Sequence, residues 1–353
     1  RVMNWWFNIL PPENMSKEDQ TLAYQGKNRK LVVLSTGLNP ENDDEVMLVR
    51  QRKSRIYFLR RFFDYPISLT PNTLIGLGPI RTIRIGFSYI RSILFPINNE
   101  TNLEEFFINR FGRELYLTFF KSYTEKVWGV DCDKISAEWG AQRIKGLSVT
   151  KTLFHMIKRI LPQRSSISQK ETETSLIEKF LYPKYGPCQM WEEVAKQIIS
   201  MGGEIIKNMD VVKINLSQDY KILSLEAQDA ETKQNKVFEG NYFFSTMPIK
   251  ELIKDMGKSV SKNIQEISDG LIYRDFITVG LLLKELKIKE ETKNGNKLIK
   301  DNWIYIQEPD VLLGRLQIFN NWSPYLVANQ NNVWIGLEYF CYETDATWSL
   351  SEQ

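Results

Sequence analysis

The sequence predicts an α/β protein in which a mostly helical region precedes a mixed region and a strand-rich region. Three observations support this fold class. Residues 71–161 carry apolar side chains at helical spacing, residues 189–262 combine helical segments with short apolar runs, and residues 274–341 contain four apolar runs of strand length. The 353 residues are enough for two or three domains, each with a sizeable core.

The first strong signals lie between residues 54 and 95. Residues 54–69 are rich in apolar and aromatic side chains and predict a β-hairpin of two short strands. Residues 71–95 predict one helix that begins with Pro71, a residue favoured in the first helical turn. Three basic residues share one face of this helix: Arg81, Arg84 and Arg91. Such a face is typical of a solvated helix, and a stripe that binds a membrane surface or an anion is the alternative.

Residues 102–129 predict further helix. Asn102 precedes two acidic residues, a pattern typical of a helix N-terminus. Apolar and aromatic residues then recur every four positions and predict a buried stripe: Phe111, Leu115, Phe119, Tyr123 and Val127. Beyond them we expect helix over residues 137–161 and a polar linker over residues 163–175.

The second half of the chain changes pattern. A helix over residues 189–201 should end at the glycine pair 202–203, and another helix is expected over residues 249–256. Strands are predicted at 204–208, 210–216, 220–229, 236–248, 274–283, 302–307, 312–319 and 333–340.

Composition excludes several classes of function. The net charge of +3 does not favour a nucleic-acid-binding domain, which is usually strongly basic. Cys132, Cys188 and Cys341 lie far apart and form neither a disulfide framework nor a metal-binding spacing, which indicates a reducing, cytoplasmic environment. A single histidine, His155, excludes a His-based triad or a multi-His metal site within this chain. Arginines interrupt residues 71–95, so we expect no transmembrane segment, whereas peripheral contact with a membrane stays open.

Familiar catalytic motifs are missing. The sequence contains no GxGxxG, no glycine-rich phosphate loop, no GxSxG and no HExxH. The acidic pairs at 43–44 and 104–105 are adjacent residues, which point apart on a helix and do not form an acid–base dyad by themselves. If the chain belongs to an enzyme, we therefore expect a cofactor to supply the chemistry.

A family resemblance centres on RFGRELYLTFFKSYTEKVWG, residues 110–129. This stretch resembles the helical motif of the UDP-galactopyranose mutases, in which a Gly-Arg pair is followed by Leu-Tyr, Phe-Phe-Lys, Gly-Tyr-Thr and then Lys with Trp. Residues 62–69 and 312–324 are similar to further mutase segments. Residues 182–198 and 242–252 resemble segments shared more widely, by the FAD-dependent amine oxidase and protoporphyrinogen-oxidase-like superfamily.

The resemblance implies part of a Rossmann-like FAD-binding domain, with an inserted helical domain and an antiparallel β-sheet substrate domain. We therefore expect four segments. Residues 1–70 would form the strand and hairpin part of the substrate sheet and the entry from the FAD domain, and residues 71–175 the helical substrate domain. Residues 176–262 would belong to the FAD-binding domain, and residues 263–353 to the antiparallel sheet. Relatives also carry a GxGxxG segment before these parts and a Gly-Asp flavin segment after them, so we expect an internal fragment of a longer protein.

Substrate-site residues follow from the resemblance, position by position. Arg315 matches one of the two arginines that hold the substrate diphosphate, and Arg143 lies near the second, offset by about one residue. Arg274 resembles another recurrent arginine, for which a structural ion pair is the alternative role. Tyr123 and Trp128 match the aromatic residues that contact the uridine, although periodicity alone would place Tyr123 in the core.

The same comparison implies cofactor contacts. Val211 and Val212 match the strand whose backbone meets the adenine end of FAD. Thr246 and Pro248 would lie near the cofactor at the end of their strand. No metal is expected.

The predicted function is that of an FAD-dependent enzyme acting on a small molecule, a nucleotide sugar whose pyranose and furanose forms it interconverts through reduced flavin. The family's Tyr-Tyr-Pro segment is absent from GLEYFCYETDATWSLS, residues 336–351. Two alternatives therefore stay open. One is an FAD-dependent oxidoreductase of the amine oxidase or protoporphyrinogen-oxidase-like type. The other is an inactive scaffold that does not hold FAD, in which case the 353 residues alone would purify without yellow colour.

Overall fold

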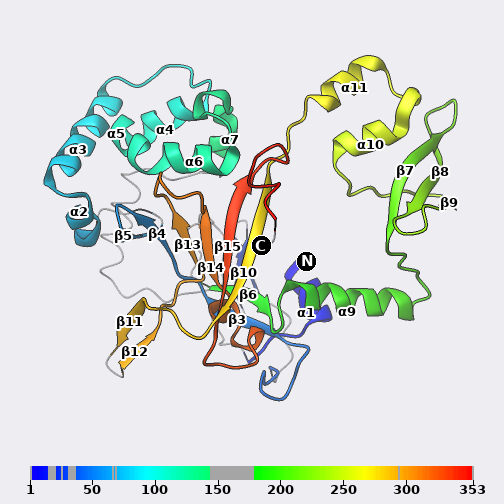
Figure 1. The fold of residues 1–353 in the computed structure, drawn as a ribbon, viewed down its shortest axis with the longest axis horizontal. Coiled ribbons are helices and arrows are strands. Elements are labelled where there is room, and N and C mark those ends of the chain that lie inside the picture. Colours follow the sequence, from blue (N-terminus) through cyan, green and yellow to red (C-terminus); the bar gives the residue numbers. More distant parts are fainter. Residues whose placement is uncertain are drawn as a thin grey trace. The chain divides into compact units, whose positions relative to one another are not determined.

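The computed structural model describes residues 2–14, 21–24, 27–30, 37–65, 67, 70–143, 179–292 and 295–351. The chain divides into two compact units, the first formed by residues 1–194 with 274–353 and the second by residues 195–273. Helices and several sheets alternate along the sequence (Figure 1), which confirms the predicted α/β class. The expected helix and linker between residues 144 and 175, and His155 with them, lie outside the described residues.

The first unit is built on a six-stranded sheet with the order β10-β15-β14-β13-β4-β5. Neighbouring strands are antiparallel, except that β13 and β4 run parallel. In chain order the strands are β4 (Ser54–Phe58), β5 (Arg61–Asp64), β10 (Asp275–Leu283), β13 (Trp303–Ile306), β14 (Arg315–Ile318) and β15 (Val333–Cys341). Strands far apart in the sequence therefore become neighbours at the centre of the sheet.

The predicted hairpin at the start of this sheet is confirmed by β4 and β5. Its two turn residues, Leu59 and Arg60, have positive φ angles of 52° and 57°. A two-residue turn with both residues in this region matches the twist of the strands, although it strains residues that carry a Cβ. The backbone N–H of Arg60 donates to the carboxylate of Glu308 at 2.6 Å, which ties the turn to the segment after β13.

Side chains alternate between the two faces of the sheet, and each face has its own core. On one face, Ile56 and Phe63 join the aromatic core of a group of helices. On the other face, Ile304, Ile318 and Ile335 form a second apolar cluster. The predicted site residue of β14, Arg315, lies on the face of the sheet that packs on the helices.

The helical group lies over one end of the sheet (Figure 1). Its helices are α2 (Pro71–Leu77), α3 (Pro79–Leu94), α4 (Leu103–Phe111), α5 (Arg113–Leu115), α6 (Lys121–Trp128) and α7 (Ala137–Arg143), with a π-helical turn over Tyr116–Phe120 and a 3₁₀ turn over Cys132–Lys134. The expected single helix over residues 71–95 is wrong. Gly78, with φ 77°, separates α2 from α3, because a residue in that region of φ ends a helix.

The predicted helix N-terminus at Asn102 is confirmed, since its side-chain oxygen accepts a hydrogen bond from the N–H of Glu105 at 3.0 Å. The predicted stripe is buried only over its first part. Phe111, Leu115 and Phe119 are buried, whereas Tyr123 is half-buried, as is Val127. The π-helical turn lies within the stripe and changes its phase, so the later residues no longer face the same core.

The remaining elements of the first unit form small additions to the main sheet. Where the structure describes this unit, two-stranded sheets pair β1 (Thr21–Tyr24) with β2 (Lys27–Lys30), β3 (Met47–Gln51) with β6 (Lys179–Pro183), and β11 (Lys289–Thr292) with β12 (Gly295–Leu298). Further helices among the described residues are α1 (Val2–Ile9), the short α12 (Phe319–Trp322) and α9 (Pro187–Ser200), whose residues from 195 onward belong to the second unit. Phe7 and Leu10 pack with Met47 and Met190, which joins α1, β3 and α9 in one cluster.

Besides the end of α9, the second unit contains a three-stranded sheet and two helices. These are β7 (Met209–Leu216), β8 (Ile222–Asp229), β9 (Asn235–Glu239), α10 (Ile249–Met256) and α11 (Lys262–Asp269), with a 3₁₀ turn over Gly257–Ser259. The predicted helix over residues 249–256 is confirmed. The predicted strand at 204–208 is wrong, and the one predicted at 236–248 is observed only over its first part, as β9. Among the described residues, 204–208 and 240–248 have no partner strand with which to form a ladder.

Candidate functional site

An arginine and several tyrosines meet on the sheet face beneath α6. Arg315 of β14 is the cross-strand neighbour of Tyr305 on β13 and of Glu338 on β15, so these side chains share one face. Tyr305 packs against the aromatic core of the helices. Tyr123 of α6 meets the ring of Tyr305 edge-on, with centroids 5.6 Å apart and an interplanar angle of 89°. We call Tyr65, Tyr123, Tyr305, Arg315 and Glu338 the arginine–tyrosine face.

Burial controls the ionisation of two tyrosines in this face. It is the largest cause that raises the pKa of Tyr123 and that of Tyr65. The ring of Tyr65 lies 4.5 Å from the ring of Tyr305, centroid to centroid. The guanidinium of Arg52 lies 4.9 Å from the ring centroid of Trp303, beside this group. The phenols of Tyr65 and Tyr123 therefore stay neutral at physiological pH and can act as hydrogen-bond donors.

Glu338 holds Arg315 by one edge of its guanidinium group. The Nε of Arg315 donates to the carboxylate of Glu338 at 2.5 Å, and the side-chain amide of Gln317 donates to the other oxygen of that carboxylate. Glu338 is only 3% exposed, whereas the side chain of Arg315 is 36% exposed. Within the described chain, the two terminal nitrogens of Arg315 make no hydrogen bond. A fixed guanidinium with two open donors suits the oxygens of a phosphate or carboxylate.

Sequence reasoning missed Glu338, although a signal was present. Its strand, VWIGLEYFC, is apolar apart from this one acidic residue, which lies 23 positions after Arg315. Two opposite charges in two apolar strands are best accommodated by pairing, since an unpaired buried charge is costly. That argument would have placed the two strands side by side.

Arg274 is engaged by backbone carbonyls at the end of α6. It donates to the carbonyl oxygens of Lys126 at 3.3 Å, Val127 at 3.2 Å and Phe340 at 3.0 Å. It also lies 3.5 Å from the carboxylate of Asp345. A cation at a helix C-terminus satisfies carbonyls that have no partner within the helix and opposes the negative end of the helix dipole. The contact with Asp345 is the structural ion pair that the sequence analysis named as the alternative role of Arg274. A role of Arg274 in catalysis stays a prediction.

Trp128 lies away from the arginine–tyrosine face. It is five residues beyond Tyr123, which on an α-helix is a rotation of about 140°. Its ring packs edge-on against Trp139, with centroids 4.9 Å apart, and its carbonyl oxygen accepts a hydrogen bond from Tyr342 at 2.9 Å. The structure therefore brings Tyr123 to Arg315 but does not bring Trp128 to them.

The other predicted residues are spread over the chain. Arg143 is the last residue of α7, and its side chain is outside what the structure describes. Val211 and Val212 lie on β7, and Pro248 is the N-cap of α10, with Thr246 just before it in an irregular segment. These last four belong to the second unit, where their contacts with a cofactor stay predictions.

The second unit fits one part of FAD better than another. The pairing of β7 with β8 shifts register between Val211 and Lys213, so Val212 is left out of the ladder and its side chain is 38% exposed. Such a bulge leaves backbone groups available for the adenine end of the cofactor. In residues 195–273, however, no glycine-rich turn leads from a strand into a helix, so this unit offers no cradle of that kind for the diphosphate.

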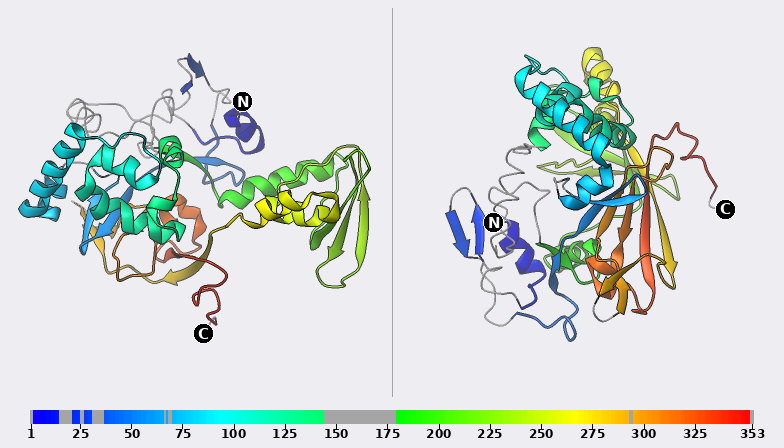
Figure 2. Two further views of the ribbon diagram at one scale, coloured as in Figure 1. Left: turned by 90° about the horizontal axis from the view of Figure 1, so that it is seen from above. Right: turned by 90° about the vertical axis from the view of Figure 1, so that its left-hand side faces the viewer.

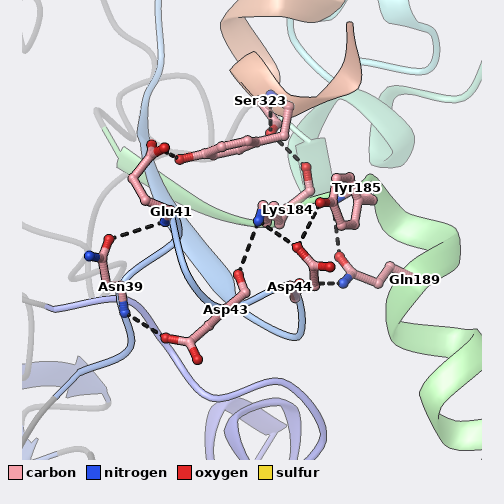
Figure 3. A network of polar contacts seen from close by, with 9 residues as sticks. Asn39, Glu41, Asp43, Asp44, Lys184, Tyr185, Gln189 and Ser323 are labelled. Carbon is pink, nitrogen blue, oxygen red and sulfur yellow. Dashed lines mark hydrogen bonds and ion pairs between the residues drawn. The ribbon is translucent and has the colours of Figure 1, made fainter. Parts of the chain in front are cut away.

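A second polar cluster surrounds the buried lysine Lys184, between β6 and α9 (Figure 3). Lys184 is 4% exposed, and its ammonium lies 2.7 Å from the carboxylate of Asp44 and 3.1 Å from the carbonyl oxygen of Asp43. The hydroxyl of Tyr185 also donates to Asp44, at 2.7 Å. Ser323 donates to the carbonyl oxygen of Lys184 at 2.6 Å.

Charge pairing within this cluster is mutual. The hydrogen bond from Lys184 is the main cause that lowers the pKa of Asp44. Burial alone would lower the pKa of Lys184, but its hydrogen bonds with Asp44 and Tyr185 raise it. The pair therefore stays ionised and joins the loop before β3 to the turn after β6. We interpret it as a structural clamp, which sequence reasoning did not identify.

The sequence matches no family model and no curated protein. Solved structures of similar fold were found. The crystal structure of a reduced UDP-galactopyranose mutase superposes with a TM-score of 0.64 at 19% identity, covering 84% of this chain and 59% of the mutase. A Pyrococcus furiosus protein gives a TM-score of 0.52 at 14% identity, covering 96% of this chain and 75% of that one. An oxidoreductase from Methanosarcina mazei gives 0.51 at 12% identity, covering 95% and 72%.

These likenesses confirm the predicted likeness in fold to UDP-galactopyranose mutase, and they show that an oxidoreductase shares this fold. This chain spans less than two thirds of the length of the mutase.

Proposed function

We propose that this chain is part of an FAD-dependent enzyme that binds a nucleotide sugar on the arginine–tyrosine face. The observation that carries the proposal is the fixed guanidinium of Arg315, with its open donors, beside the ring of Tyr305 and below Tyr123 of α6. A diphosphate is bound well by a cation with two parallel hydrogen-bond donors, and a uracil stacks on an aromatic side chain. Residues from three separate elements supply both on one face.

Each residue of the face has a distinct part in this proposal. Arg315 would pair with the diphosphate oxygens and stabilise the charge of the leaving UDP. The neutral hydroxyl of Tyr123 would donate a hydrogen bond, and its ring would stack on the base, worth about 1–3 kcal/mol. Glu338 would hold the guanidinium in place. A bound flavin would supply the redox-active ring with which the mutase family interconverts sugar ring forms.

Titration of the 353-residue chain with UDP by calorimetry tests the binding step. Arg315→Gln removes the charge and the fork and should weaken UDP binding by roughly 10- to 100-fold. Arg315→Lys keeps the charge but not the paired donors of the guanidinium, so its affinity for UDP should lie between that of the native chain and that of Arg315→Gln. The matched control is Arg113→Gln, because Arg113 is exposed and lies 3.8 Å from its acidic partner Glu104. Absence of UDP binding by the native chain, or equal binding by Arg315→Gln, would refute the proposal.

One observation favours a second function, that of an oxidoreductase. The carboxylate of Glu338 neutralises Arg315, so this pair carries no net positive charge toward an anionic substrate. One structure of similar fold is named as an oxidoreductase. With added FAD, oxygen consumption on amine substrates together with no affinity for UDP would support this function. If the purified chain neither retains yellow colour nor binds added FAD, these residues alone are a scaffold without cofactor.

A further inference from the structure

Helix α3 turns a row of apolar side chains toward solvent. Ile80 and Phe87 are each 71% exposed, and Leu94 is 65% exposed. Ile83 and Ile90 lie between them and are also more than half exposed. We call these five residues the α3 stripe. The helix lies at the outer edge of the helical group, and the right-hand view of Figure 2 looks onto it.

The five residues of the α3 stripe are regularly spaced along α3, and the opposite side of this helix is packed against the other helices. At about 100° per residue, its five members fall within an arc of roughly 80°. The opposite side of α3 is fixed against the other helices, because Ile85 and Ser92 are buried and Ser88 accepts a hydrogen bond from the N–H of Glu114 at 3.1 Å. The apolar surface continues beyond both ends of α3, at Ile75 on α2, which is 71% exposed, and at Phe95, which is 75% exposed.

All charged residues of α2, α3 and their flanking segments are basic. No acidic residue occurs between Asp64 and Glu100, and the charged residues in that interval are Arg81, Arg84 and Arg91. Arg84 and Arg91 are exposed, and they fall within about 40° of the edge of the α3 stripe. An amphipathic helix with an exposed apolar face and basic side chains beside it is typical of a helix that lies in a membrane interface.

We propose that α2 and α3 dock on an anionic phospholipid surface, with the α3 stripe inserted among the acyl chains and the arginines paired with acidic headgroups. None of the described helices is both long and apolar enough to cross a membrane, so the contact would be in the plane of the interface. A second copy of this chain fits less well. Pairing two stripes would gather the arginines of both helices in one interface, without an acidic residue on either helix to oppose them.

Sedimentation with lipid vesicles tests the docking surface in the 353-residue chain. The chain should bind vesicles that contain about one third phosphatidylserine more tightly than vesicles of phosphatidylcholine alone, and salt should weaken this preference. The double variant Phe87→Ser/Ile90→Ser should lower binding to anionic vesicles by more than about tenfold. The double variant Arg84→Gln/Arg91→Gln should lower it by about fivefold per arginine.

Matched controls lie far from α3 in the sequence. Lys284→Gln/Lys287→Gln removes two exposed positive charges, and Ile288→Ser removes an exposed apolar side chain. Both should bind vesicles as the native chain does, and circular dichroism checks that all variants are folded. Equal binding by stripe variants and controls would overturn the proposal. The proposal would also be overturned if the native chain did not bind vesicles and instead formed a dimer without lipid, measured by analytical ultracentrifugation, that the Phe87→Ser/Ile90→Ser substitutions dissociate.

Discussion

Lys126→Met should loosen the segment that leads from β13 to β14. The ammonium of Lys126, on α6, donates to backbone carbonyl oxygens of residues 306–313: those of Ile306 at 3.0 Å, Glu308 at 2.9 Å and Val311 at 2.8 Å, with a longer contact to Leu313 at 3.5 Å. Lys126 thereby joins the helix that carries Tyr123 to the segment that positions Arg315. Methionine keeps the apolar length of the side chain but supplies neither charge nor donors.

The expected loss of stability follows from these contacts. Each hydrogen bond from a charged donor contributes about 1.5–3 kcal/mol, and an acceptor left unpaired in a buried place costs a similar amount. The cost of burying the ammonium offsets part of this, and burial also lowers the pKa of Lys126. We therefore expect Lys126→Met to lower the free energy of unfolding of the first unit by about 2–4 kcal/mol, a large share of the ~5–15 kcal/mol typical of a protein.

Urea unfolding followed by tryptophan fluorescence measures this loss in the correct unit, because none of the nine tryptophans lies within residues 195–273. The control is Lys121→Met on the same helix. Lys121 is 40% exposed and lies 3.7 Å from Glu104 and 3.6 Å from Glu125, so its loss should cost less than about 1 kcal/mol. The reasoning is refuted if the two variants lose the same stability, or if Lys126→Met loses less than about 1 kcal/mol.

Two further predictions concern charge. Glu338→Gln keeps an acceptor for Arg315 but removes the opposing charge, so UDP affinity measured by calorimetry should rise several-fold; an unchanged or lower affinity would contradict this. Burial raises the pKa of Cys132 to about 11 from an ordinary value near 9.0, so the folded chain holds this proton more tightly than the unfolded chain. The stability advantage over Cys132→Ala should therefore be complete below pH 9 and shrink by about 2–3 kcal/mol as pH rises to about 11. A difference between the two proteins that does not change with pH would refute the assignment.

Local patterns in the sequence were enough to predict several elements. The apolar run around residues 54–64 gave the hairpin, and the helix over residues 249–256 was found at its observed position. Such elements depend on the spacing of apolar residues and on turn and cap chemistry, which act over a few neighbours. The resemblance at residues 110–129 added the relationship in fold that the solved structures confirm.

Elements that depend on distant partners were harder to predict. Residues 204–208 have the composition of a strand but pair with no described strand. Residues 71–95 read as one helix, yet a positive φ at Gly78 divides them. In both cases the outcome is set by contacts that local composition does not record.

The sequence by itself determined the α/β class, the order of most elements and the presence of Arg315 and Tyr123. Only the tertiary structure decided which of the predicted site residues lie next to one another. It paired Arg315 with Glu338, turned Trp128 away from them and placed Arg274 on the carbonyls of α6. It also decided that α3 exposes its apolar residues as well as its arginines. The physical reason is that the burial and ion pairing of a side chain depend on the residues close to it in space, and a single sequence specifies those residues only through the fold.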